Sequence, residues 1–324
     1  MTRVLDVRDL RVSFPTSAGR RFHPVDGVSF TLDRGETLAL VGESGCGKSL
    51  TSLALVRLVP APGRVDAGST IRLGDTDVLA LEGEALRRIR GKRIGMIFQD
   101  PMTSLNPVFT VGDQIAEGVR AHARMSRADA RERARALLQE VGIPDPAGRL
   151  DAYPHQLSGG MRQRVMIAIA LAAEPEILVA DEPTTALDVT VQAQILEVLD
   201  ELRRRRGMAV LLITHDLGIV AGRADRVAVM YAGQIVEEAP TLELFEHPSH
   251  PYTQGLFASV PRITGPVTRL TPIGGTVPPP TAWPSGCRFR PRCPQAFEKS
   301  ERPPELLPVG PAHRMRCWLA ERSG

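Results

Sequence analysis

One octapeptide restricts the possible fold more than any other segment. Residues Gly42–Ser49 read GESGCGKS and match the pattern G-x-x-x-x-G-K-S. The apolar run Glu36–Val41 comes before it and is typical of a buried strand, while Leu50–Leu58 after it is predicted to be helical. A glycine-rich loop between a strand and a helix predicts an α/β fold with a phosphate-binding site.

The residue types in this loop suit the chemistry of a phosphate group. Glycines let the backbone turn so that N–H groups converge, and the helix N-terminus adds a partial positive charge. We expect Lys48 to lie between the β- and γ-phosphates and the Ser49 hydroxyl to ligate Mg²⁺, whereas Cys46 is interpreted as packing. The motif alone permits GTPases, kinases and ATPases. The candidate nucleotide-binding residues of the loop are Gly42, Glu43, Ser44, Gly45, Cys46, Gly47, Lys48 and Ser49.

Two further predicted strands end in polar residues. Ile177–Ala180 is followed by Asp181 and Glu182, and Met208–Ile213 is followed shortly by His215. Open α/β sheets bind their ligands at the carboxyl ends of strands. We therefore expect Asp181 to hold Mg²⁺, Glu182 to polarise an attacking water, and His215 to contact a γ-phosphate.

The segment Leu157–Arg164, LSGGMRQR, opens a predicted helix that runs to about Ala173. Together with the preceding motifs it resembles the ATP-binding subunits of ABC transporters, whose signature is LSGGQ; here Met161 stands where glutamine is usual. The resemblance spans residues 4–238. It implies an α/β fold with a P-loop NTPase core of ABC ATPase type, an antiparallel β subdomain, a helical signature subdomain and a Pro- and Cys-rich C-terminal extension.

The resemblance also implies roles for single residues. Gln99 looks like the Q-loop glutamine that senses Mg²⁺ and γ-phosphate, and Asp188 lies in what looks like the D-loop, Ala186-Leu187-Asp188. Phe14 stands at about the place of the aromatic that stacks on adenine, although Phe22 is close and either could be core. The family forms a head-to-tail dimer in which each signature caps the partner's ATP. The implied signature contacts are Ser158, Gly159 and Gly160. The implied Mg²⁺ ligands are Ser49, Gln99 and Asp181, and the implied catalytic residues are Glu182, His215 and Gln99.

Residues 100–172 are expected to form the helical subdomain, which in the family docks on membrane subunits. Val111–His122 and Ala128–Val141 read as helices, the second with a capping box from Ser126 and Asp129 and an end at Gly142. Four arginines are interpreted as a solvated face in preference to a docking patch: Arg127, Arg131, Arg133 and Arg135. The run Arg203–Arg206 is expected to end a helix, where it suits the helix dipole, in preference to contacting nucleic acid.

Composition excludes several classes of protein. A net charge of +3 over 324 residues gives no reason to expect a nucleic-acid partner. No apolar run approaches the roughly 18 residues of a membrane span, and the N-terminus lacks the apolar core of a signal peptide.

Only three of the 40 cations are lysines. Lys48 is the one whose identity the phosphate loop explains, because a guanidinium would not fit the same space; Lys92 and Lys299 have no such explanation.

The chain changes character in its last part. Residues 240–324 hold 16 of the 27 prolines and read as turns and loops after about residue 262. The segments 246–253 and 286–294 resemble oligopeptide, dipeptide and nickel importers in particular. We therefore predict an ATPase domain over residues 1–260 and an extension over residues 261–324. His247 and His250 each precede a proline, so we expect turn residues in preference to metal ligands.

Three cysteines, Cys287, Cys293 and Cys317, lie in this extension. Relatives carry four, several of which bind an iron–sulfur cluster, and the third aligns with Ser300. Three alternatives stay open: a [4Fe–4S] cluster with an unusual fourth ligand such as Ser300 or His313, a zinc site using the same groups, or a loop without a metal.

The resemblance predicts an ATPase, with ATP and Mg²⁺ as cofactors, that energises an importer of di- or oligopeptides. The expected partners are two integral membrane permeases, a sister ATP-binding subunit and, indirectly, an extracytoplasmic substrate-binding protein. The expected location is the cytoplasmic face of the bacterial inner membrane, as a peripheral subunit. The alternatives are a non-transport ABC ATPase of DNA repair or translation, an importer of nickel or another small solute, and a metal-sensing or regulatory module built on the extension.

Overall fold

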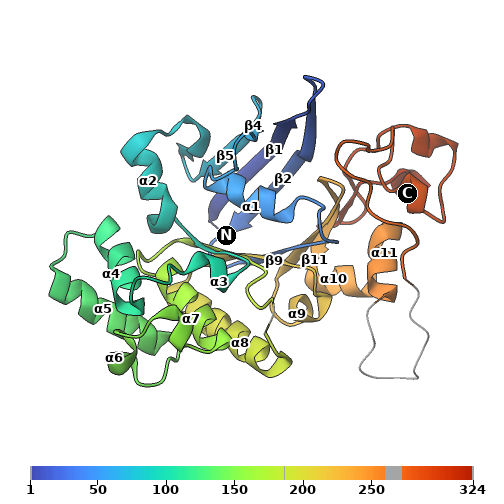
Figure 1. Cartoon of the computed structure of the whole chain (residues 1–324). Coiled ribbons are helices and arrows are strands. Elements are labelled where there is room, and N and C mark those ends of the chain that lie inside the picture. The colour runs from blue at the N-terminus through green and yellow to red at the C-terminus, as the bar shows by residue number, and fades with distance from the viewer. Residues whose placement is uncertain (1, 186, 260–271, 323–324) are drawn as a thin grey trace. The chain divides into compact units, whose positions relative to one another are not determined.

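The computed structural model describes residues 2–185, 187–259 and 272–322 (Figure 1). Ala186 of the predicted D-loop and the predicted domain boundary at residues 260 and 261 lie outside them. The chain divides into two compact units. The first unit comprises residues 1–5, 32–36 and 72–213, and the second comprises residues 6–31, 37–71 and 214–324.

The first unit is built around parallel strands that the sequence predicts as apolar runs. β7 (Ile94–Ile97) pairs in parallel with β8 (Ile177–Asp181), and β8 pairs in parallel with β9 (Ala209–Thr214). Every residue of β8 and β9 is buried, which is typical of parallel strands covered on both faces. β9 begins and ends one residue later than the predicted strand, and β8 includes Asp181.

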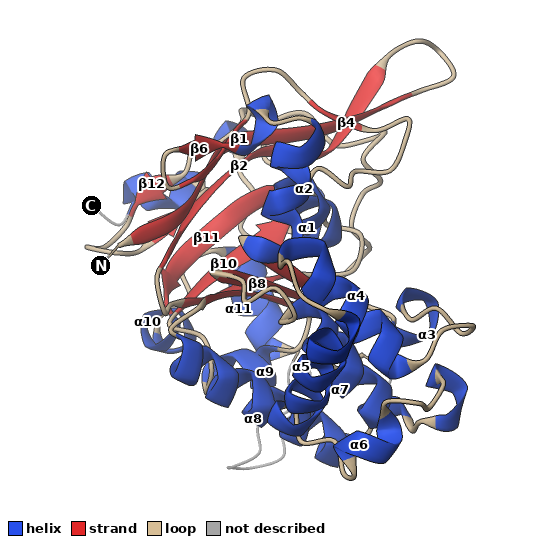
Figure 2. Ribbon diagram, turned by 90° about the vertical axis from the view of Figure 1, so that its left-hand side faces the viewer, coloured by secondary structure: helices blue, strands red, loops and turns tan. Residues whose placement is uncertain are grey.

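Seven helices of this unit are described. α4, α5 and α7 pack beside one another (Figures 1 and 2). α4 matches its prediction, and α5 is displaced from its prediction by one residue. The Ser126 hydroxyl caps α5 by accepting from Asp129 N–H, but it also donates to the Asp129 carboxylate, so the reciprocal bond of a capping box is replaced. The helices are α2 (Gly83–Lys92), α3 (Pro101–Ser104), α4 (Val111–His122), α5 (Arg127–Glu140), α6 (Pro146–Arg149), α7 (Gly159–Ala170) and α8 (Val189–Arg206). Two 3₁₀ turns are η1 (Val78–Ala80) and η2 (Pro154–Gln156).

Two long strands and three short ones supply the β subdomain that the resemblance predicts. β1 (Arg3–Pro15) is hydrogen-bonded to β2 (Arg21–Asp33), and the two long strands lie side by side in Figure 2. β4 (Arg64–Val65) pairs antiparallel with β1, and β6 (Thr76–Asp77) pairs antiparallel with β5 (Thr70–Leu73).

The second unit contains the strand that leads into the phosphate loop. β3 (Thr37–Val41) pairs in parallel with β10 (Arg226–Tyr231), and β10 pairs antiparallel with β11 (Gln234–Pro240). Its helices are α1 (Lys48–Leu55), α9 (Leu217–Ala221), α10 (Thr241–Glu246) and α11 (Pro251–Ala258), with 3₁₀ turns η3 (Arg290–Arg292), η4 (Glu298–Glu301) and η5 (Trp318–Arg322). α1 begins two residues before the predicted Leu50 because Gly47, at φ 108°, turns the chain into the helix.

The C-terminal extension joins this unit through strands and core packing. β13 (Arg314–Met315) pairs antiparallel with β11, and β12 (Leu307–Pro308) pairs antiparallel with β13. Phe289 is buried in the same apolar cluster as Tyr231 and Tyr252. The loops predicted for the extension are confirmed. They are attached to the second unit by the pairing of β13 with β11 and by the burial of Phe289. Among the described residues, no helix is long and apolar enough to cross a membrane.

Candidate nucleotide-binding and hydrolysis sites

The phosphate loop in the second unit follows β3 and leads into α1. Gly42 and Gly47 both have positive φ, 153° and 108°. A Cβ on Gly42 would lie 2.1 Å from the Met230 carbonyl oxygen, and one on Gly47 would lie 2.5 Å from the Pro24 carbonyl oxygen. Both positions therefore require glycine, because neighbouring backbone occupies the space of any side chain.

Lys48 lies inside this loop with a buried side chain. Its Nζ donates to the carbonyl oxygens of Gly42, at 2.7 Å, and Glu43, at 3.0 Å. Cys46 is fully buried, in agreement with its interpretation as a packing residue, and burial raises the pKa of its thiol. The loop thus holds a compact ammonium against its own backbone, next to the N-terminus of α1, where anions are favoured.

Glu43 makes contacts that the sequence analysis did not foresee. Its backbone N–H donates to the Tyr252 hydroxyl at 3.0 Å. Its carboxylate accepts two bonds from the Arg292 guanidinium, at 2.9 and 3.1 Å. No sequence signal links these residues, since they lie more than 200 positions apart in the chain.

In the first unit, two predicted catalytic residues that follow two different strands lie in contact. Gln99 follows β7, Glu182 follows β8, and Gln99 Nε2 donates to Glu182 Oε2 at 3.1 Å. The same oxygen accepts from the Thr185 hydroxyl at 2.9 Å. The backbone of Glu182 has φ 46°, a value that residues other than glycine rarely adopt. Its N–H donates to the Ile213 carbonyl. Asp181, at the end of β8, is buried.

The signature segment lies at the start of α7 in the same unit. The Ser158 hydroxyl caps α7 by accepting from Met161 N–H at 3.3 Å. A Cβ on Gly160 would lie 2.6 Å from Val191 Cγ1, and one on Gly159 would lie 3.4 Å from Leu187 Cδ2. Asp188 caps α8 by accepting from Val191 N–H at 2.9 Å. The structure therefore packs the signature glycines against the segment that contains Asp188.

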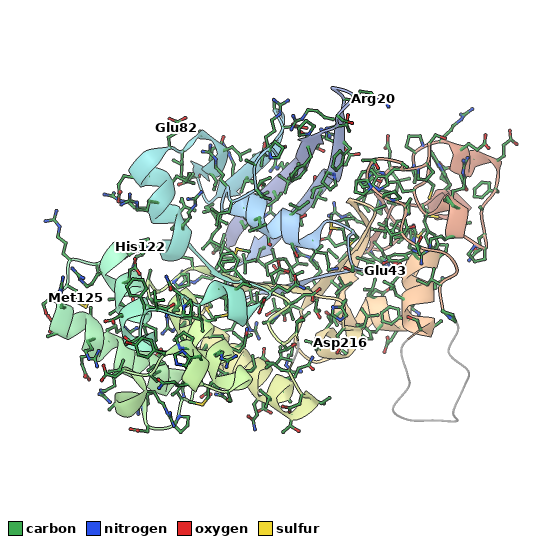
Figure 3. The ribbon with its side chains drawn as sticks, viewed as in Figure 1. Arg20, Glu43, Glu82, His122, Met125 and Asp216 are labelled. Atoms are coloured by element: carbon green, nitrogen blue, oxygen red, sulfur yellow. The ribbon has the colours of Figure 1, made fainter. Side chains whose placement is uncertain are left out.

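His215 and Phe14 belong to the second unit. His215 is exposed directly after β9, and the next residue, Asp216, caps α9 (Figure 3). Phe14 is half-buried near the end of β1 and stacks on Phe22 with ring centroids 5.9 Å apart. The predicted contact of Phe14 with adenine stays a prediction.

The cysteines of the extension are free thiols, and all three are half-buried. Burial raises the pKa of each thiol, to about 11 for Cys317. Among the described residues, no three His, Cys, Asp or Glu side chains are grouped so as to hold a metal ion. Ser300 Oγ accepts from Phe297 N–H, and His313 Nε2 lies 2.7 Å from a Glu237 oxygen. The described side chains therefore do not form a ligand set that fits an iron–sulfur cluster.

Both histidines that precede prolines lie at helix ends. His250 is the N-cap of α11, and its Nδ1 accepts from Tyr252 N–H at 3.0 Å. His247 is the C-cap of α10. The structure therefore places both as helix caps, where the sequence analysis expects turn residues. Burial lowers the pKa of His250 to about 4, so its ring is neutral at physiological pH.

The surface arginines of α5 form ion pairs. Arg131 pairs with Asp151, Arg133 with Glu174 and Arg135 with Glu132, each between side chains that are at least 30% exposed. This agrees with the interpretation as a solvated face. Arg203–Arg206 occupies the last turn of α8, as predicted.

The comparisons with known proteins agree with this geometry. The family model described as "ABC transporter" matches residues 25–185, and the model described as "Oligopeptide/dipeptide transporter, C-terminal region" matches residues 236–299. The "Dipeptide transport ATP-binding protein DppD" of Bacillus subtilis is 50% identical over 99% of this chain and 96% of its own length. The "Oligopeptide transport ATP-binding protein AppD" of the same organism is 49% identical over 100% of this chain and 99% of its own.

A solved structure shows the same architecture. The dimeric, ADP- and Pi-bound post-hydrolysis state of the ATP-binding cassette MJ0796 matches with a TM-score of 0.65 and 26% identity, over 73% of this chain and 98% of its own. Fold and motifs define an ATP-binding cassette. The chain belongs to the family of ATP-binding proteins of ABC transporters, and it is an ATPase of that family with ATP and Mg²⁺ as cofactors.

Proposed function

We propose that this chain is the ATP-hydrolysing subunit of an importer of di- or oligopeptides. The observation that carries the proposal is the similarity over the whole chain, at about half identity, to dipeptide and oligopeptide transport ATP-binding proteins. The match of residues 236–299 to the oligopeptide/dipeptide transporter C-terminal region supports it independently of the ATPase motifs.

Within the second unit we assign ATP phosphate binding to the loop 42–49. Two observations support this assignment: glycines at 42 and 47 are required by close backbone, and the Lys48 ammonium is buried beside the N-terminus of α1. We assign Ser49 to Mg²⁺, His215 to the γ-phosphate and Phe14 to adenine.

Within the first unit we assign Glu182 as the general base that takes a proton from the attacking water, and Gln99 as the residue that orients the Glu182 carboxylate. The hydrogen bond between Gln99 and Glu182 supports both roles. Bound Mg²⁺ would neutralise phosphate charge, and Asp181 with Gln99 would hold it. Ser158, Gly159 and Gly160, together with Asp188, would act across a dimer on the partner's ATP.

The proposed partners are two membrane permeases and a sister ATP-binding subunit, with a substrate-binding protein as an indirect partner. The proposed location is the cytoplasmic face of the bacterial inner membrane, with the chain as a peripheral subunit.

For the extension we favour the loop without a metal. Ser300 Oγ and His313 Nε2 are each engaged in a hydrogen bond, and the described residues contain no group of three potential metal ligands. Iron, sulfide and zinc assays on anaerobically purified protein test this, and a stoichiometric metal would contradict it.

The function is tested by co-expressing this chain with candidate permeases and a candidate sister subunit from the same organism. We expect a membrane complex whose ATPase activity rises when a peptide-loaded binding protein is added, and in which Glu182→Gln abolishes the rise. Stimulation by nickel-loaded binding protein alone would redirect the proposal to nickel import. Binding to ribosomes or DNA ends without a membrane partner would overturn it.

A further inference from the structure

We propose that the C-terminal extension sets the shape of the phosphate loop through Arg292, a positioning residue for ATP binding. The proposal rests on the assignment of residues 42–49 as the phosphate loop. All residues that carry it lie in the second unit, and Figure 3 labels Glu43, the residue of the loop that the extension holds.

Arg292 is built into the extension as an anchored side chain. Its side chain is 4% exposed, and its Nε donates to the Gly274 carbonyl at 2.8 Å. Its guanidinium lies 5.7 Å from the ring centroid of Tyr231. The remaining two nitrogens face the Glu43 carboxylate and bind it through two parallel bonds, the arrangement that gives an Arg–carboxylate pair both strength and a fixed direction.

Glu43, which Arg292 holds, is in turn hydrogen-bonded to Lys48. The Glu43 carbonyl oxygen accepts from Lys48 Nζ at 3.0 Å and from Cys46 N–H at 3.4 Å. The Glu43 N–H donates to the hydroxyl of Tyr252, which is fully buried. The side chain, the N–H and the carbonyl of Glu43 are therefore all fixed, so the position of the Lys48 ammonium depends on a residue of the extension.

A second arginine of the extension, Arg288, supports the loop indirectly. Arg288 donates to the Ala232 carbonyl at 2.5 Å, pairs with Asp26 and lies over the Trp283 ring at 3.6 Å. The next residue, Gly233, donates its N–H to the Cys46 carbonyl at 2.9 Å. Arg288 thus supports the turn between β10 and β11, and that turn supports Cys46.

Through these two arginines the extension supports the phosphate loop at two points. Arg288 and Arg292 are four residues apart, on either side of Phe289, which is buried in the core cluster. The short segment 288–292 therefore reaches the loop at Glu43 directly and at Cys46 through one turn. Without it, the Glu43 carboxylate would lose its two charged hydrogen bonds and the loop would be free to adopt other conformations.

The test is the affinity of the full-length chain for Mg²⁺–ATPγS by calorimetry. Arg292→Gln should weaken binding about tenfold, or roughly 1.4 kcal/mol, and should raise KM for ATP while leaving kcat nearly unchanged. Arg292→Lys should rescue little, because an ammonium cannot make two parallel bonds. Arg290→Gln is the matched control, since Arg290 lies in the same turn but pairs with Glu301. Equal affinity of the Arg292→Gln and Arg290→Gln variants would overturn the proposal.

A double-mutant cycle separates positioning from folding. Glu43→Gln and Arg292→Gln should each weaken binding, and the double variant should be no weaker than either alone. If single variants unfold, the exchanged pair Glu43→Arg with Arg292→Glu should restore both the melting temperature and ATP affinity. Restored melting without restored affinity would contradict the proposal. Unchanged affinity in Lys48→Ala would instead show that the loop assignment itself is wrong.

Discussion

The Gln99 amide donates to the Glu182 carboxylate at 3.1 Å, although the two residues lie 83 positions apart in the chain. They follow the neighbouring parallel strands β7 and β8, whose carboxyl ends meet at one edge of the sheet. With Thr185 as a second donor, Glu182 is held as an oriented carboxylate. This orientation is what a general base for water attack requires.

Glu182→Gln should therefore retain ATP binding and lose hydrolysis by about 100-fold or more, the contribution expected of a general base. The amide keeps the shape of the side chain but cannot accept the proton of the attacking water. Phosphate release under saturating ATP measures the loss, and calorimetry with ATP measures the binding. Near-normal turnover would remove Glu182 from this role.

Lys48→Arg should lose ATP affinity about as completely as Lys48→Ala. The Lys48 ammonium fits between two carbonyl oxygens of a loop whose glycines leave no room for side chains. A planar guanidinium is larger and demands a fork of acceptors that this space does not offer. Equilibrium binding of ATP to the three proteins decides the question, and tight binding by Lys48→Arg would mean that charge alone is sufficient.

Gly160→Ala should destabilise the protein by about 1–3 kcal/mol, because the new methyl group would overpack the contact with α8. Its Cβ would lie 2.6 Å from Val191 Cγ1. Val191→Ala removes that methyl carbon, so the double variant should recover most of the lost free energy of unfolding. Urea unfolding of the four proteins gives the coupling. The absence of recovery would mean that the neighbouring backbone, and not Val191, sets the requirement for glycine.

Several elements of the fold and several candidate site residues can be predicted from the sequence. Local patterns predict β3, β8, β9 and α4 within a residue or so, since each is a buried apolar run or a capped amphipathic segment. The sequence identifies Lys48 and Glu182 as candidates because each lies where a strand ends or a helix begins, and the resemblance to the ABC signature identifies Ser158. These features depend on short stretches of chain, which is why one sequence is sufficient to find them.

The contacts of the extension could not be predicted in this way. The pairing of β13 with β11 and of Arg292 with Glu43 joins residues far apart, and neither has a local pattern. In the sequence the cysteines are candidate metal ligands, whereas in the structure Arg292, which lies between Cys287 and Cys293, contacts Glu43 of the phosphate loop, and Arg288 contacts the turn between β10 and β11 at Ala232. Long-range pairs of this kind require coordinates.

His250 makes the stability of the protein depend on pH in a defined window. It is buried, caps α11, and has its pKa lowered by burial from 6.5 to about 4; the Glu237 carboxylate and the backbone of Arg316 act in the opposite direction. As pH falls from 6.5 to about 4, the unfolded chain binds a proton that the folded chain does not. Stability should therefore fall across that window by roughly 3 kcal/mol from this residue.

His250→Asn is the test, because asparagine can still cap the helix and does not titrate. Urea unfolding at steps between pH 6.5 and 4 should show the wild-type chain losing about 3 kcal/mol relative to the variant, since carboxylates common to both proteins cancel in the difference. His313 offers a control of opposite sign. Its hydrogen bond to Glu237 raises its pKa, so its contribution is present below pH 6.5 and is lost as pH rises through the folded value. Parallel pH profiles for wild type and His250→Asn would contradict the prediction.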